Sequence, residues 1–135
     1  MQIFKFGGAS VKDADGVKNL AHVLSKVGYN NTLIVVSAMG KTTNAMETVI
    51  ANYFDAKHQL QSSLQEVKKF HNNILLDLFE NEKHLVFKTV DKLFQEIVLF
   101  FDHNKSPNYN FVYDQVIGFG ELISTTIISH YLNEI

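Results

Sequence analysis

A short apolar strand pattern that stops at two glycines opens this chain and limits how it can fold. Residues 2–6 are mostly apolar, Gly7 and Gly8 follow, and a helical pattern comes next. Paired glycines let the backbone approach a ligand closely, and a helix beginning just beyond them would present free N–H groups and a positive dipole end. Lys5, near the carboxyl end of the strand, would add a mobile positive charge. The pattern therefore predicts a site for an anion, most simply a phosphate.

Strand and helix patterns alternate over the first part of the chain and predict an α/β fold. Residues 32–37 are rich in β-branched side chains, as buried parallel strands are. Between the two strand patterns, apolar residues recur at helical spacing from Val17 to Val27, and Gly28 is placed to end that helix. We therefore expect one strand–helix–strand unit with parallel strands.

The rest of the chain carries helical patterns only. Breaks fall at residues 80–83 and in the polar segment 102–108. Two strands cannot cover so many apolar helix faces, so we expect a helix-rich piece of a larger α/β domain. The helices are predicted over residues 43–54, 60–78, 86–101 and 111–135.

Composition narrows the class of protein without indicating its chemistry. The 135 residues include no cysteine, which excludes a disulfide framework and a thiolate metal site, and the six histidines are too scattered to predict a metal centre. The net charge is −2 and every basic residue is a lysine, so a nucleic-acid partner is not expected. Without a signal peptide pattern or a membrane-length apolar run, the prediction is a cytoplasmic protein with no membrane contact.

Three stretches stand in a fixed order along the chain: KFGGASV at Lys5–Val11, VVSAMGKTTN at Val35–Asn44 and GELIS at Gly120–Ser124. Together they resemble the motifs of the aspartokinases, within the amino acid kinase family. The family usually has threonine where this chain has Ala9, which removes a hydroxyl beside the phosphate loop. The resemblance implies the three-layer α/β/α amino acid kinase fold. Residues 1–135 would then be the N-terminal part of a single kinase domain, without its nucleotide-holding half and any regulatory domains.

The function implied by this resemblance is ATP-dependent phosphorylation of the β-carboxylate of L-aspartate, the first step toward lysine, threonine and methionine. Mg²⁺ would accompany ATP, and no ligand for it is identifiable here. The resemblance further implies that Lys5 contacts the transferring phosphoryl group and that Gly7, Gly8 and Ser10 bind the ATP phosphates. The complete enzyme is expected to be a homo-oligomer, and this piece alone is expected to be inactive because the adenine-holding half is absent.

The same resemblance places Ser37 and Thr43 at the aspartate site and assigns Glu121 to the α-ammonium group of aspartate. The residues alone also allow plainer roles: Ser10, Ser37 and Thr43 can cap helices or turns, and Glu121 can lie on the polar side of an amphipathic helix. Glu121 nevertheless stands in an apolar stretch, where an ionised carboxylate needs a partner. The glycines before it are costly inside a helix, which indicates close approach of another backbone or of a ligand.

One motif is misleading and two other interpretations stay open. Gly40-Lys41-Thr42 imitates the end of a Walker A motif, but Val35 stands where that motif requires glycine. We therefore reject a P-loop. The chain could instead come from another member of the amino acid kinase family that acts on a different acid. It could also be a non-catalytic helical interaction module with an anion-binding loop.

Overall fold

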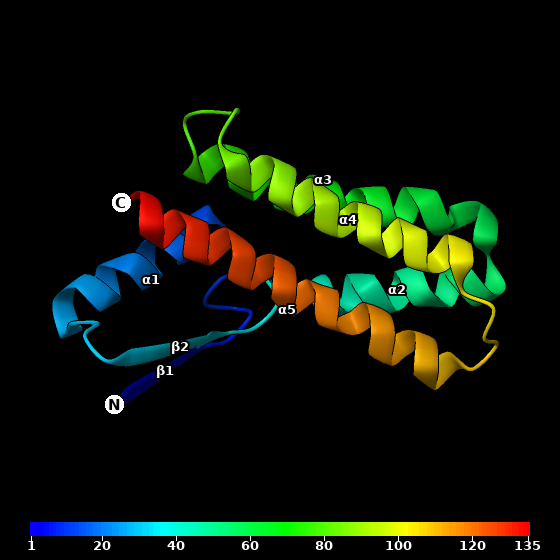
Figure 1. Cartoon of the computed structure of the whole chain (residues 1–135), viewed down its shortest axis with the longest axis horizontal. Helices are drawn as coiled ribbons and strands as arrows, with labels where there is room; N and C mark the ends of the chain where they lie inside the picture. The colour runs from blue at the N-terminus through cyan, green and yellow to red at the C-terminus, as the bar shows by residue number, and fades with distance from the viewer.

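The computed structural model describes all 135 residues and places a small parallel sheet beside a group of helices (Figure 1). The two strands pair in parallel, with Phe6 opposite Val36, and helix α1 connects them, which confirms the predicted strand–helix–strand unit. The second strand ends one residue earlier than predicted, although the Ser37 N–H still donates to the Phe6 carbonyl at 3.0 Å. The elements are β1 (Gln2–Phe6), α1 (Ala14–Val27) and β2 (Thr32–Val36).

The start of α1 corrects one prediction. The helix begins at Ala14 rather than directly after the two glycines, and its N-cap is Asp13, whose carboxylate accepts the Gly16 N–H at 2.8 Å. An aspartate caps well and its charge interacts favourably with the helix dipole. The chain before it forms a turn, in which the Ser10 N–H donates to the Gly7 carbonyl at 3.0 Å. The possible role of Ser10 as an N-cap is therefore wrong, and the free amides of the helix end do not adjoin the glycines.

The end of α1 follows the prediction. Gly28 has a φ of 87°, in the left-handed region that favours glycine, and its N–H donates to the Leu24 carbonyl at 2.9 Å. Asn31 has a φ of 50°, which asparagine tolerates better than most residues. These two residues turn the chain back toward β2.

The four predicted helices are confirmed, with every end within two residues of the expected position. In Figure 1 the hairpin of α3 and α4 lies above α2, and α5, the longest helix, runs from the α2 side across to the sheet. Helix α5 packs against α2, α4 and β2. The elements are α2 (Thr42–Asp55), the short 3₁₀ turn η1 (Lys57–Gln59), α3 (Leu60–Leu78), α4 (Leu85–His103) and α5 (Tyr109–Glu134).

One hydrophobic core lies between the helices and a single face of the sheet. Because side chains alternate along a strand, Phe4 and Phe6 pack against this core while Ile3 is 56% exposed on the opposite face. The second strand alternates in the same way, with Ile34 and Val36 on the core side. Within these residues the helices cover one face of the sheet, so the chain supplies strands and one helical layer of the predicted fold. None of its helices combines the length and the hydropathy needed to cross a membrane.

Candidate active site

Three segments far apart in the sequence meet beyond the carboxyl ends of the two strands. They are the glycine turn (residues 7–10) after β1, the second loop (residues 37–41) after β2, and the turn of α5 at Gly120. Ligands of open parallel α/β sheets bind at this edge. The three sequence motifs therefore lie in one place.

The glycine turn and the second loop are in direct backbone contact. The Gly40 N–H donates to the Gly8 carbonyl at 3.0 Å. A Cβ atom on Gly8 would lie 2.9 Å from the Gly40 carbonyl oxygen and 3.0 Å from that of Ala38, and neither backbone atom can move aside as a flexible side chain would. Gly7, in contrast, has no atom within 4 Å of its Cβ position. Packing therefore requires glycine at position 8, whereas position 7 faces open space.

Gly8→Ala is expected to lower the free energy of unfolding by roughly 1–3 kcal/mol, because the added methyl group forces the two loops apart. The matched control is Gly7→Ala, which should leave stability within about 0.5 kcal/mol of the original because nothing occupies the space. Urea unfolding of both variants measures the difference. Equal stability of the two variants would show that the loops are not packed as described.

The glycine turn offers an uninterrupted set of hydrogen-bond donors. The N–H groups of Gly7, Gly8 and Ala9 make no hydrogen bond within the protein. Consecutive free amides of this kind form a concave site for an anion. At the start of α1, in contrast, Asp13 and Asp15 already supply negative charge. An anion would therefore bind more favourably to the amides of the glycine turn than to the start of α1, where the sequence pattern predicted the site.

The predicted phosphate-binding side chains are accessible. Lys5 and Ser10 are both exposed. Lys5 lies next to the last residue of β1 and opposite Val35 of β2, on the face of the sheet that no helix covers. Its ammonium group is therefore free to reach a ligand from that face.

The second loop leads into a helix that has two free amides in its first turn. The N-cap of α2 is Lys41, which makes no side-chain capping bond, and the N–H groups of Thr43 and Asn44 have no partner within the protein. Ser37 and Thr43 are exposed at this edge. A helix N-terminus of this kind favours a negatively charged group such as a carboxylate.

Helix α5 approaches the second loop at Gly120. A Cβ atom there would lie 3.2 Å from the Ala38 Cβ and 3.3 Å from the Thr42 Cγ2, which explains a glycine inside this helix. Gly118 has no such neighbour within 4 Å, and the neighbours of Gly120 are side-chain carbons rather than the backbone or ligand that we predicted. Glu121, the next residue, is exposed. Its carboxylate is therefore solvated, so the apolar stretch around it in the sequence does not by itself require a partner.

Two buried polar residues that we did not predict as site residues support the second loop. The Thr42 hydroxyl donates to the Met39 carbonyl at 2.6 Å, and it lies 3.4 Å from Nε2 of His71. His71 is fully buried on α3, as its place on a core stripe predicted, and its Nδ1–H donates to the Val67 carbonyl at 2.8 Å. A histidine among the apolar residues of a helix stripe is buried and needs hydrogen-bond partners. This need is the sequence feature that could have pointed to a polar contact of His71.

Burial lowers the pKa of His71 below its ordinary value of 6.5, and the hydrogen bond to the Val67 carbonyl acts in the opposite direction. Below pH 6.5 the unfolded chain takes up a proton on this ring while the folded chain resists it. We therefore expect the free energy of unfolding to fall as the pH drops below 6.5, by at most about 1.4 kcal/mol per pH unit.

Urea unfolding at about pH 7.5 and about pH 5.5 tests this expectation when the original chain is compared with His71→Phe. The variant keeps an aromatic ring but cannot be protonated, so it should lose less stability on acidification than the original chain. An identical loss in both proteins would contradict the assignment to His71.

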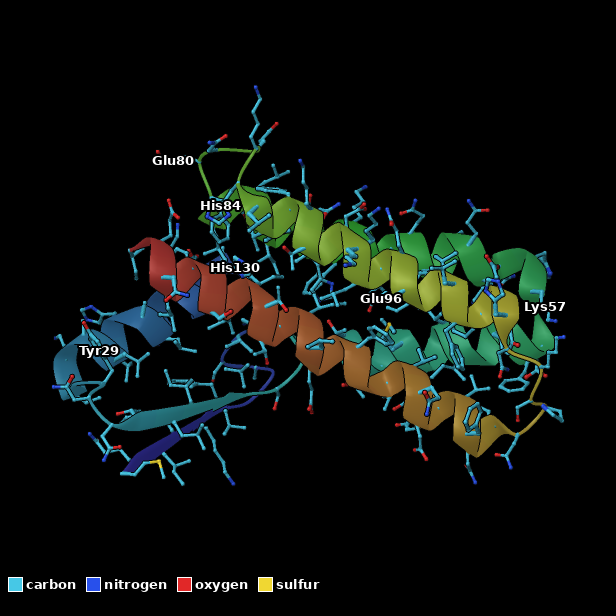
Figure 2. The ribbon with its side chains drawn as sticks, viewed as in Figure 1. Tyr29, Lys57, Glu80, His84, Glu96 and His130 are labelled. Atoms are coloured by element: carbon cyan, nitrogen blue, oxygen red, sulfur yellow. The ribbon has the colours of Figure 1, made fainter.

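The labelled histidines of Figure 2 belong to a different part of the molecule. His84 and His130 lie where the loop between α3 and α4 meets the C-terminal part of α5. Nδ1 of His84 accepts the Val86 N–H at 3.0 Å, so its Nε2–H donates to the Glu134 carboxylate at 2.9 Å. This histidine caps α4 and joins it to α5. Nowhere in the chain do three or more His, Asp or Glu side chains gather as a metal site.

Residues 1–135 match the sequence profile of the Amino acid kinase family along their whole length. The chain belongs to the amino acid kinase family. It is 29% identical over 140 residues to aspartokinase 2, chloroplastic, of Arabidopsis thaliana, an alignment that covers 98% of this chain and 24% of that protein. Bifunctional aspartokinase/homoserine dehydrogenase 2 of Escherichia coli (strain K12) is 28% identical over 138 residues, with 98% of this chain and 16% of the relative covered. The chain thus spans a quarter or less of the length of these relatives.

Solved structures confirm the predicted amino acid kinase fold. E. coli aspartokinase III in complex with aspartate and ADP has a TM-score of 0.82 at 21% sequence identity. The same protein in complex with lysine and aspartate has a TM-score of 0.83 at 22% identity. Each comparison covers 99% of this chain and 29% of the solved chain. This member of the amino acid kinase family therefore has the fold of the corresponding part of an aspartokinase.

Proposed function

We propose that this chain is the N-terminal part of an aspartate kinase, which transfers the γ-phosphoryl group of ATP to the β-carboxylate of L-aspartate and forms 4-phosphoaspartate. The contact between two sets of free backbone donors is the observation that supports this most. The amides of Gly7 to Ala9 form one set, those of Thr43 and Asn44 the other, and the Gly8–Gly40 hydrogen bond joins their loops. Transfer of a phosphoryl group to a carboxylate requires two anions held side by side, against their mutual repulsion.

In the proposed reaction a β-carboxylate oxygen attacks the γ-phosphorus in line with the bond to the departing oxygen of ADP. The new O–P bond forms as the bond between the β,γ-bridging oxygen and the γ-phosphorus breaks. Because a carboxylate is already ionised at neutral pH, no general base is needed. Catalysis then rests on positioning and on neutralising phosphoryl charge, which we assign to Lys5, to the amides of Gly7 and Gly8, and to the Ser10 hydroxyl. Mg²⁺ is proposed to arrive with ATP, and we assign it no ligand within this chain.

The aspartate is proposed to bind between the second loop and α5. Glu121 pairs with the α-ammonium group, while Ser37 and Thr43 contact the substrate through their hydroxyls or neighbouring amides. Two observations support this placement: all three side chains are exposed, and Gly120 brings the turn that carries Glu121 against Ala38 and Thr42. The relatives named aspartokinases and the solved complexes with aspartate favour this substrate within the family.

The test is phosphoryl transfer by the full-length protein with Mg-ATP and, in separate reactions, aspartate, glutamate or N-acetylglutamate. Saturable ADP release with aspartate alone, together with trapping of the acyl phosphate by hydroxylamine, is the expected result. A preference for either of the other acids would indicate a different member of the amino acid kinase family. Binding of ATP or phosphate without transfer to any acid would instead favour a non-catalytic module.

The proposal extends to the pathway, the compartment and the oligomeric state of the full-length protein, and to the activity of residues 1–135 alone. The reaction is placed as the first step of lysine, threonine and methionine biosynthesis, in the cytoplasm, although the Arabidopsis relatives are chloroplastic. The full-length protein is proposed to be a homo-oligomer, which sedimentation would measure. Residues 1–135 alone are proposed to be inactive, since nothing in them is assigned to hold the adenine of ATP.

A further inference from the structure

Thr42 contacts three separate parts of the molecule. Its hydroxyl oxygen lies 2.6 Å from the Met39 carbonyl oxygen of the second loop and 3.4 Å from Nε2 of His71 on α3. Its Cγ2 methyl lies 3.3 Å from the Cβ position of Gly120 on α5. Thr42 therefore joins the second loop, α3 and α5.

The orientation of His71 is fixed by its surroundings. The ring is fully buried, and its centroid lies 5.1 Å from that of Phe70 and 5.8 Å from that of Phe94. Because a carbonyl can only accept, the Val67 carbonyl at 2.8 Å places a hydrogen on Nδ1, so Nε2 is an acceptor. The one hydrogen of the Thr42 hydroxyl is then shared between the Met39 carbonyl at 2.6 Å and Nε2 at 3.4 Å, with Nε2 as the second acceptor of a three-centre bond. An apolar residue would pack here without the desolvation cost of a polar ring. Packing alone therefore does not explain why position 71 is a histidine.

We propose that His71 is a positioning residue for the aspartate site, which acts through the Thr42 hydroxyl to hold the second loop against the Gly120 turn of α5. This inference rests on the proposed function. The contact sets the separation between Thr43, one residue beyond Thr42, and Glu121, one residue beyond Gly120. His71 touches no substrate in this scheme, and its loss should weaken aspartate binding while leaving ATP binding unaffected.

The test uses three variants of the full-length protein and steady-state kinetics. His71→Phe keeps an aromatic ring and removes both nitrogens, so the KM for aspartate should rise roughly five- to tenfold, with kcat and the KM for ATP within about twofold. His71→Gln can place an amide group near the position of Nε2 and should restore a KM for aspartate close to the original. The matched control is His103→Phe, since exposed His103 makes the same kind of ring contact to a carbonyl, that of Leu99 at 2.9 Å, and should change nothing.

Thr42→Val provides a second measurement with little change of shape. It removes the hydroxyl and keeps two branches on Cβ, so it should raise the KM for aspartate at least as much as His71→Phe does. Adding His71→Phe to Thr42→Val should then have no further effect on that KM, because the contact is already lost. If His71→Phe does not fold, the same cycle is made with His71→Leu, which also removes both ring nitrogens.

The outcomes separate this inference from the proposed function. If the original full-length protein does not phosphorylate aspartate, both are overturned. If it does so and Thr42→Val leaves the KM for aspartate unchanged, only the role of His71 is overturned. The role is also overturned if His71→Gln is as impaired as His71→Phe, or if the KM for ATP rises equally, since His71 would then be a core residue alone.

Discussion

Lys5→Ala in the full-length protein is expected to lower kcat for aspartate phosphorylation by about a hundredfold or more, with little change in the KM for aspartate. Lys5 is exposed on β1, one residue before the strand ends and close in sequence to the free amides of the glycine turn. It is proposed to stabilise the charge that is redistributed over the phosphoryl group as the bond breaks. An interaction that strengthens in the transition state affects kcat rather than the binding of the other substrate.

The control for this experiment is Lys18→Ala. Lys18 is also exposed but lies on α1, and it is not assigned to the site. Its removal tests whether loss of any single lysine lowers the rate through the net charge. A near-normal kcat for Lys5→Ala would leave Lys5 as a surface lysine at a strand end.

Glu121→Ala is expected to raise the KM for aspartate by roughly ten- to a hundredfold, the effect of losing one charge-assisted hydrogen bond, while the KM for ATP stays near its original value. The proposed contact to the substrate ammonium group is present before and during the reaction, so its loss is a loss of uniform binding. Initial rates over a range of aspartate concentrations at saturating ATP give the KM for aspartate, and rates over a range of ATP concentrations at saturating aspartate give the KM for ATP.

A carboxylate elsewhere on the surface serves as the control for Glu121. Glu96 is exposed on α4 and is labelled in Figure 2. Glu96→Ala should leave both KM values unchanged. If Glu121→Ala also left the KM for aspartate unchanged, Glu121 would be an ordinary solvated residue of α5 and the substrate ammonium group would need a different partner.

The fold was largely predictable because its signals are local. Strand β1 is marked by the abrupt stop at Gly7, α1 ends at a glycine whose φ of 87° the helix end requires, and the breaks between helices fall at clusters of polar residues. Each of these features depends on a few neighbouring residues, so it can be recognised without knowledge of the rest of the chain.

The start of α1 was not predicted because two local signals competed. Ser10 and Asp13 can both cap a helix, and only the turn at Gly7, closed by the Ser10 N–H, decides between them. The donors of the candidate phosphate site are consequently turn amides rather than helix amides. The sequence pattern therefore indicated the correct glycines, but it wrongly predicted that the free N–H groups beside them belong to the start of a helix.

The contacts that assemble the site could not be predicted from the sequence because they join residues far apart in the chain. Nothing in the sequence indicates that Thr42 faces both His71 and Gly120, since these residues come from three helices that meet only through packing. The sequence left the exposure of Glu121 undecided for the same reason. An apolar neighbourhood in the sequence does not determine on which side of α5 a carboxylate lies.

The hydrogen bond between Gly8 and Gly40 has a thermodynamic consequence. The Gly40 N–H to Gly8 carbonyl bond ties the glycine turn to the second loop, so a ligand that strengthened or weakened this bond from one loop would change the free energy of the other loop. Occupancy at the two loops is then linked, and such linkage is reciprocal. Whatever factor a bound nucleotide imposes on the affinity for the amino acid, the amino acid must impose on the affinity for the nucleotide.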